Sequence, residues 1–393
     1  MIRVRAHETR HLFGVVAFGL ALAGAAACAP IEQLDARNPS EREVGWPVLS
    51  LRWRMELADR AEDAKPQEFA SPAALTASDP DRDRLFVGSH EGVFYALEAT
   101  TGQMLWKKKL GSTSSRPVLA PDASMLYLGT DDGHVLAVDP KDGRVKWRYS
   151  TRGPVLESPE LSGDLVILSN EADQVYALDR MTGKFRWQYK SETPEEFTLR
   201  GHAGVTVQGD LVFTGFSNGT LVALRVATGS VAWLTSLKGE ATKFVDVDAT
   251  PAVVGENVFA ASSAGGVYAI DRTTGLIRWR LPLLGAGALS TDGERLYVGA
   301  ADEGVFAIDL AGNIIWRQGT RGGGEPAGPV VAGDYLLYAL SEAGLYVADK
   351  RTGQVHEYFD PGFGISAIPT LSRDHMYVMS NSAVLYAMTL RRF

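Results

Sequence analysis

The residues best suited to recognising another molecule lie in two stretches of the chain. The first stretch contains Phe197, Leu199 and Arg200, and the second contains Asp246 and Asp248. Apolar side chains beside an arginine, with further charges close by, are the usual composition of a protein-binding hot spot. The same charges also suit a purely internal role, in which Arg200 pairs with one of the acids and holds two loops together, or the two acids cap a turn. Residue types alone leave the two interpretations equal.

Signals for catalysis are weaker. Residues 215–219 read Gly-Phe-Ser-Asn-Gly, the pattern of a nucleophile elbow, but an elbow leads from a strand into a helix, whereas this segment joins two expected strands. We therefore predict a β-turn. Among the histidines after residue 27, no two have metal-ligand spacing, and the Gly322–Gly324 run precedes Pro326 and a strand, where a phosphate-binding loop would precede a helix. The sequence predicts a non-enzymatic protein without cofactor or metal.

The N-terminus is typical of an export signal. Three arginines precede an uncharged apolar run, Leu12–Ala27, which is followed by Cys28, the single cysteine of the chain. We expect residues 1–27 to be a lipoprotein signal peptide, Cys28 to carry the lipid, and residues 28–45 to form a flexible tether. The alternative is an ordinary signal-peptidase site with an incidental thiol. The segment resembles a bacterial lipobox, and this resemblance implies that Ala29, the residue after the cysteine, is compatible with sorting to the outer membrane.

The charge balance excludes one class of partner. Removing the signal takes three basic and one acidic residue from totals of 39 and 47, which leaves a net charge near −10. Nucleic-acid binding depends on basic surfaces that neutralise phosphates, so no nucleic-acid partner is predicted.

The remainder of the chain, residues 46–393, is repetitive. A glycine followed four residues later by tryptophan recurs at intervals of 37 to 46 residues, a period typical of four-stranded propeller blades. The pairs are Gly102/Trp106, Gly143/Trp147, Gly183/Trp187, Gly229/Trp233, Gly275/Trp279 and Gly312/Trp316. A seventh copy at Gly353 has Glu357 in the tryptophan position.

The repeat also predicts how the ring closes. Eight copies of the third strand can be recognised, the last at Val384–Met388, but too few residues follow it to form a fourth strand. Residues Leu49–Leu57, around Trp53, are an orphan copy of that fourth strand. We therefore predict an all-β fold, an eight-bladed β-propeller of four-stranded antiparallel blades, in which an N-terminal strand completes the last blade.

The turn motif Asp-x-x-Thr-Gly-x-x-x-Trp, complete at Asp179–Trp187, has a physical basis. Asp and Thr bond nearby backbone groups, Gly takes a positive φ, and Trp packs on the neighbouring blade, so we interpret the tryptophans as structural. The motif resembles the pyrroloquinoline-quinone-like propeller repeat. Quinoprotein dehydrogenases share that repeat, but this chain has neither their cysteine pair nor an insertion to cover a cofactor.

Two consecutive intervals of 46 residues mark the place where the repeats differ. Both insertions follow a tryptophan strand, so they join the outer strand of one blade to the inner strand of the next and lie side by side on one face. The lipoprotein signal, the tether, the eight repeats, Leu-Arg-Gly at 199–201 and Asp-Val-Asp-x-Thr-Pro at 246–251 together resemble the BamB family. That resemblance implies that Leu199, Arg200, Asp246 and Asp248, with Phe197 in place of a leucine, contact a POTRA domain of a BamA-type barrel protein.

The resemblance implies a function. We predict a non-catalytic, lipid-anchored scaffold on the periplasmic face of the outer membrane. Its partners would be the barrel subunit, other Bam lipoproteins and unfolded outer-membrane proteins. The alternatives are an envelope propeller with a different protein partner and a quinone-dependent oxidoreductase.

Overall fold

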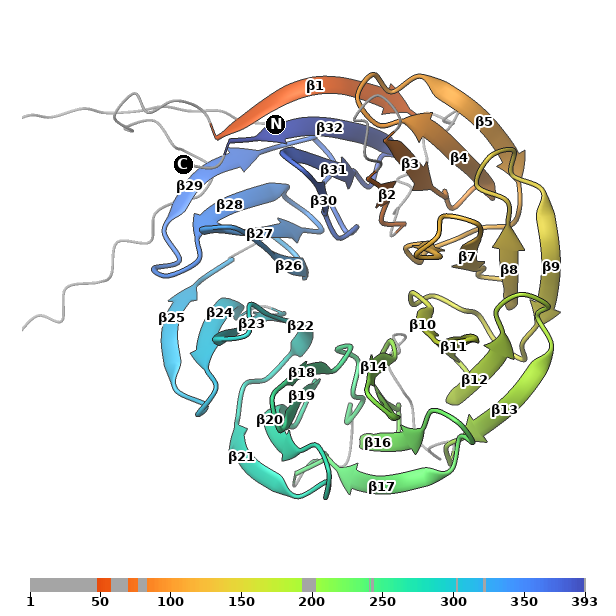
Figure 1. Ribbon diagram of the computed structural model, residues 1–393. Helices are drawn as coiled ribbons and strands as arrows, with labels where there is room; N and C mark the ends of the chain where they lie inside the picture. Colours follow the sequence, from red (N-terminus) through yellow and green to blue (C-terminus); the bar gives the residue numbers. More distant parts are fainter. Residues whose placement is uncertain are drawn as a thin grey trace, which may run out of the picture. The chain divides into compact units, whose positions relative to one another are not determined.

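The computed structural model describes residues 48–57, 70–76, 83–192, 203–239, 241, 244–301, 303–320 and 323–391. Within these residues, thirty-two strands form eight four-stranded antiparallel sheets arranged as the blades of a ring (Figure 1). The predicted eight-bladed propeller is confirmed. No helix in the described ranges is long and apolar enough to span a membrane. The predicted signal peptide, Cys28 and the tether all lie outside the described residues.

From inner to outer strand, the first four blades in chain order are β2 (Ala73–Leu75), β3 (Arg84–Val87), β4 (Val93–Glu98), β5 (Met104–Lys109); β6 (Val118–Leu119), β7 (Leu126–Gly129), β8 (His134–Val138), β9 (Val145–Ser150); β10 (Glu160–Ser162), β11 (Leu165–Asn170), β12 (Gln174–Asp179), β13 (Phe185–Lys190); and β14 (Thr206–Gln208), β15 (Leu211–Gly215), β16 (Thr220–Arg225), β17 (Val231–Ser236).

The other four are β18 (Ala252–Val254), β19 (Asn257–Ser262), β20 (Gly266–Asp271), β21 (Ile277–Leu281); β22 (Ala286–Thr291), β23 (Arg295–Ala300), β24 (Gly304–Asp309), β25 (Ile314–Gln318); β26 (Pro326–Ala332), β27 (Tyr335–Leu340), β28 (Leu345–Asp349), β29 (Val355–Phe359); and β30 (Thr370–Ser372), β31 (His375–Met379), β32 (Val384–Leu390), β1 (Leu49–Glu56).

The position of each strand in its blade explains its residue pattern. The second and third strands are covered by a neighbouring blade on each side, so they are apolar almost throughout, as in β12. The fourth strand is the outer edge of the blade and faces solvent in part, so it mixes buried and exposed residues. In β13, Trp187 is buried while Phe185 is exposed.

The hydrophobic core lies between successive blades. One cluster joins Phe213 and Trp233 of one blade to Val258 and Tyr268 of the next. Each fully buried side chain of this size contributes about 1.5–3 kcal/mol. Because every blade packs on the next, the ring is stabilised by repeated interfaces of the same kind.

Most interfaces between blades carry a tryptophan contact. Trp187 Nε1 donates a hydrogen bond to the carbonyl of Val226 in the next blade at 2.8 Å. Its indole ring lies against Gly229, where an added Cβ would be 2.5 Å from Cε3 of the ring. Gly229 also has a φ of +71°. Glycine is therefore required for the turn and for the close approach of the ring.

The same contact recurs at seven junctions within the described part of the chain. The indole N–H groups of these seven tryptophans donate to carbonyls of the next blade at 2.8–3.1 Å: Trp53 to Ala99, Trp106 to Pro140, Trp147 to Arg180, Trp187 to Val226, Trp233 to Arg272, Trp279 to Leu310 and Trp316 to Lys350. The predicted structural role of these residues is confirmed.

The two ends of the propeller meet in one blade. Strand β1 pairs antiparallel with β32, from Leu49 opposite Leu390 to Glu56 opposite Val384, and forms the outer edge of that sheet (Figure 1). The orphan strand predicted at Leu49–Leu57 thus completes the last blade as expected.

The eighth junction differs because no turn connects β32 to β1. The preceding outer strand, β29, has Glu357 where the others have tryptophan. Its Oε2 accepts hydrogen bonds from the backbone N–H groups of Val48 at 2.6 Å and Leu49 at 2.9 Å. A carboxylate therefore holds the start of β1 at the one junction that lacks a turn glycine.

Candidate partner-binding site

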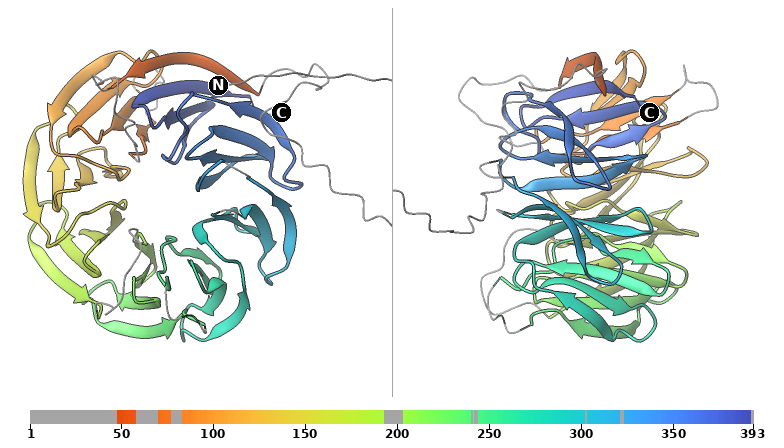
Figure 2. Two further views of the ribbon diagram at one scale, coloured as in Figure 1. Left: turned by 180° about the vertical axis from the view of Figure 1, so that it is seen from behind. Right: turned by 90° about the vertical axis from the view of Figure 1, so that its left-hand side faces the viewer.

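The loop that contains Asp246 and Asp248 connects β17 to β18 at one face of the propeller. In Figure 2, the right-hand view shows the blades edge-on, with loops gathered at the two faces. Val245 and Val247 are buried, and Val247 packs so closely on Gly215 that an added Cβ there would lie 2.3 Å from it. These two valines fix the loop to the body of the propeller.

Backbone hydrogen bonds fix the same loop to the turns on either side. The N–H of Val247 donates to the carbonyl of Phe216 at 3.3 Å, in the turn between β15 and β16. The carbonyl of Asp246 accepts from the N–H of Ser263 at 3.1 Å, in the turn between β19 and β20. The loop is thus held between two blades.

The two aspartates differ in exposure. Asp246 is 1% exposed, whereas Asp248 is half-buried. Neither residue is without an interaction partner. A carboxylate buried as deeply as Asp246 is costly unless charged or hydrogen-bonding groups compensate it, so this position is specialised.

The other three predicted site residues, Phe197, Leu199 and Arg200, lie outside the described residues. The described ends of their loop are anchored on the same face. Ser191 donates its N–H to the carbonyl of Asp173 at 2.9 Å, and the carbonyl of Ala203 accepts from Ser169 Oγ at 2.7 Å. The pairing of Arg200 with either aspartate stays a prediction.

Both long loops contact one turn, the β15–β16 turn of residues 216–219. From the first loop, Ser191 Oγ and the carbonyl of Glu192 each accept from Asn218 Nδ2 at 3.1 Å. From the second, Val247 donates to Phe216, as described above. The described parts of the two loops therefore lie side by side, as the spacing of the repeats predicted.

This turn contains the Gly-Phe-Ser-Asn-Gly segment, and its geometry explains the serine. Ser217 is buried, its Oγ donates to Asp173 Oδ2 at 2.5 Å, and its N–H donates to Asp173 Oδ1 at 3.0 Å. The segment joins two antiparallel strands, so the predicted β-turn is confirmed. Ser217 fastens two neighbouring turns.

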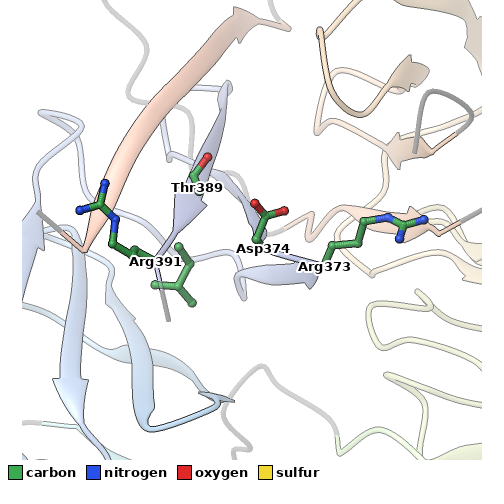
Figure 3. A pocket seen from close by; sticks show the side chains of 5 residues that line it. Arg373, Asp374, Thr389 and Arg391 are labelled. Atoms are coloured by element: carbon green, nitrogen blue, oxygen red, sulfur yellow. The ribbon is translucent and has the colours of Figure 1, made fainter. Parts of the chain in front are cut away.

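The rest of the described residues offer few groups for metal or ligand binding. No group of three or more His, Cys, Asp or Glu residues among them is arranged to hold a metal ion. A pocket of about 460 Å³ is lined by Arg373, Asp374, Thr389, Leu390 and Arg391 (Figure 3). It lies at the opposite face, by the β30–β31 turn, and its charges are engaged: Arg373 with Asp83 at 2.8 Å, and Asp374 with His375 at 2.9 Å.

Two exposed apolar residues on the face of the long loops were not singled out from the sequence. Phe244 is 50% exposed and precedes Asp246 by two residues, and Leu284 is 65% exposed in the loop between β21 and β22. The interval that contains Leu284 is the shortest of the repeat, so a search for insertions passes over it. The spacing of the repeats places Phe244 on this face, but its exposure and that of Leu284 become evident only in the fold.

Comparison with known proteins agrees with this architecture. A family profile described as outer membrane protein assembly factor BamB matches residues 50–149, 112–318 and 301–391. A comparison with curated protein sequences gives no match.

Solved structures show the same fold. The crystal structure of BamB from Moraxella catarrhalis is similar with a TM-score of 0.72 and 21% identity, over 87% of this chain and 99% of that one. The quinohemoprotein alcohol dehydrogenase of Comamonas testosteroni has a TM-score of 0.66 and 15% identity, over 87% of this chain and 76% of that one. At these identities the similarity concerns the fold.

Proposed function

Since the chain belongs to the family of outer membrane protein assembly factor BamB, we propose that it is a non-catalytic scaffold of the machinery that assembles outer-membrane β-barrels. It docks on a POTRA domain of the BamA-type barrel subunit through its two long loops. In this role it acts beside other Bam lipoproteins and aids the folding and insertion of unfolded outer-membrane proteins.

One observation supports this location of the docking site. The described parts of the two long loops, which connect β13 to β14 and β17 to β18, are fixed to the same turn through Asn218 and Phe216, on one face of the propeller. Loop residues that are fixed to the fold, such as Asp246 and Val247, present a binding surface at a lower entropic cost than mobile ones. The contact residues of the proposed site are Phe197, Leu199, Arg200, Asp246 and Asp248.

The buried position of Asp246 favours a role for this acid in holding Arg200 or a partner residue at the centre of the interface. Truncation of one member of a buried, hydrogen-bonded charge pair costs roughly 2–5 kcal/mol of binding free energy. Docking through these charges should therefore be sensitive to single substitutions.

Binding of the full-length chain to the cognate POTRA domains should be measured by calorimetry for the wild type, Arg200→Ala and Asp246→Asn. Both variants should bind more weakly. Arg225→Ala and Asp210→Ala are matched controls, because these residues form a 2.5 Å ion pair in the blade between the two loops, β14–β17, but at its opposite face. Undiminished binding by Arg200→Ala and Asp246→Asn would refute the site.

The location is part of the same proposal. We infer that residues 1–27 are removed as a signal peptide, that Cys28 is acylated, and that residues 28–45 tether the propeller to the periplasmic face of the outer membrane. Mass spectrometry of the purified membrane form should find the lipid on Cys28, and Cys28→Ser should release the protein into the soluble periplasm. Outer-membrane retention of that variant would contradict the lipid anchor.

A further inference from the structure

Phe244 combines exposure with an unfavourable backbone. Its side chain is 50% exposed, and its φ is +53°. A positive φ is rare and unfavourable for a bulky residue, so it persists only where surrounding structure imposes it. The residues that follow are fixed in the fold, since Val245 and Val247 are buried and Val247 packs on Gly215. Folding alone gives no reason for a large apolar side chain at this exposed position.

Leu284 is the second unusual position. It stands between the buried Leu283 and Gly285, which has a φ of +70°, in the tight loop from β21 to β22. Its 65% exposure places an apolar side chain in water at the end of a strand. Single exposed apolar residues are common, but two on adjacent loops of one face form the beginning of a patch.

The backbone connects these two loops. Ser263, in the turn between β19 and β20, donates its N–H to the carbonyl of Asp246 at 3.1 Å. The carbonyl of Ser263 accepts the N–H of Gly285 at 2.8 Å. The loop of Phe244 and the loop of Leu284 are thus fixed on the two sides of one turn, and their spacing is set by the fold.

We propose that Phe244 and Leu284 are two apolar anchors that extend the docking surface from the long loops onto the neighbouring blade. This inference rests on the proposed function, because it assigns both residues to the same partner. The occupant is the POTRA domain of the proposed function, because Phe244 lies in the same loop as Asp246 and Asp248, and the part of that domain that fits Phe244 and Leu284 is apolar.

The test uses the full-length chain and the cognate POTRA domains, with affinities measured by calorimetry. Phe244→Gly should weaken binding tenfold or more, because a hot-spot aromatic is removed, while glycine accepts the positive φ and the fold is retained. Leu284→Ser should weaken binding about fivefold, since a smaller apolar contact is lost.

Leu276→Ser is the matched control. Leu276 is 69% exposed and precedes β21, whereas Leu284 follows it, so the two leucines lie at opposite faces of the propeller. Leu276→Ser should bind within twofold of the wild type. Thermal unfolding of all variants checks that none of the changes acts through loss of the fold.

The outcomes separate this inference from the proposed function. Wild-type binding with unchanged affinity of Phe244→Gly and Leu284→Ser overturns the inference and leaves the docking function intact. Equal weakening by Leu276→Ser overturns it as well, because the loss would not be specific to one face. Absence of wild-type binding overturns both.

Discussion

The outer strand of a blade contacts the next blade in two different ways. Seven junctions use a tryptophan, and the junction between β29 and β1 uses Glu357. At a tryptophan junction, an indole lies on a turn glycine and donates to a backbone carbonyl of the next blade. At the junction between β29 and β1, which we call the closing junction, Glu357 accepts hydrogen bonds from two backbone N–H groups at the start of β1. The indole thus packs on the turn between two strands, whereas the carboxylate binds the start of the N-terminal strand β1.

This difference explains why the repeat changes where it does. The tryptophan has a function only if the next blade supplies a glycine turn between its third and fourth strands. In the last blade those two strands, β32 and β1, come from opposite ends of the chain. Without the turn there is no surface for an indole, but two N–H groups at a strand start are available to an anion.

Trp187→Ala should give the largest effect. It removes a buried ring from the interface and leaves the carbonyl of Val226 without its donor, so unfolding free energy should fall by about 3–5 kcal/mol. Urea unfolding followed by circular dichroism measures the loss. Trp187→Phe keeps an aromatic ring without the N–H and should lose clearly less. A loss below about 1 kcal/mol for Trp187→Ala would contradict the role of these contacts.

The glycine partner can be tested within one blade. Gly229 and Gly209 both have positive φ, +71° and +63°, but only Gly229 faces an indole; Gly209 has no atom within 4 Å of an added Cβ. Gly209→Ala should cost about 1 kcal/mol through the backbone alone. Gly229→Ala should cost about 1–3 kcal/mol more, because the ring of Trp187 must shift. Equal losses in urea unfolding would mean that the close approach is unimportant.

The sequence predicted the fold well because its signals are local and repeated. Turn acids, turn glycines and tryptophans recur with one period, and the orphan strand at Trp53 is recognisable as a missing copy. The second role of Gly229 was not predicted, because it depends on a tryptophan in the preceding blade. The role of Glu357 was not predicted either, because its partner Val48 is 309 residues away in the sequence.

The candidate site could be predicted only in part. Unequal intervals located the two long loops, and the structure places their described ends on one turn. Phe244 lies in the second of these loops, but its exposure and its positive φ could not be predicted from the sequence, and Leu284 lies in the shortest interval. Residue types indicate which side chains are suited to binding, but the fold decides which of them reach the surface.

Glu357 offers a test of the closing junction. Glu357→Ala leaves the N–H groups of Val48 and Leu49 without their acceptor, and should lower the unfolding free energy by about 1–3 kcal/mol. The rate of amide hydrogen exchange should increase most in β1. Glu357→Trp restores the consensus residue but should not restore stability, because no turn glycine faces it. A stabilised Glu357→Trp variant would refute this account.

We expect the smallest effect on stability from the aspartates of the Asp-x-x-Thr-Gly turns, such as Asp179. Hydrogen bonds from Arg186, at 2.6 Å, and from Thr182 lower the pKa of Asp179 to about 2. A folded-state pKa below the unfolded value of about 3.9 means that the unfolded state binds more protons in this range. The stabilisation is therefore complete above about pH 4 and is lost as the pH falls towards 2.

Asp179→Asn should consequently be less stable than the wild type at pH 7, and most of the difference should be lost as the pH falls to about 2. Solvent screens this turn, so the difference should be smaller than those of the preceding variants. Urea midpoints measured at a series of pH values provide the test. A difference that is the same at pH 7 and pH 2 would show that the charge of Asp179 is not what stabilises the turn, and that its hydrogen-bond geometry alone accounts for the repeat.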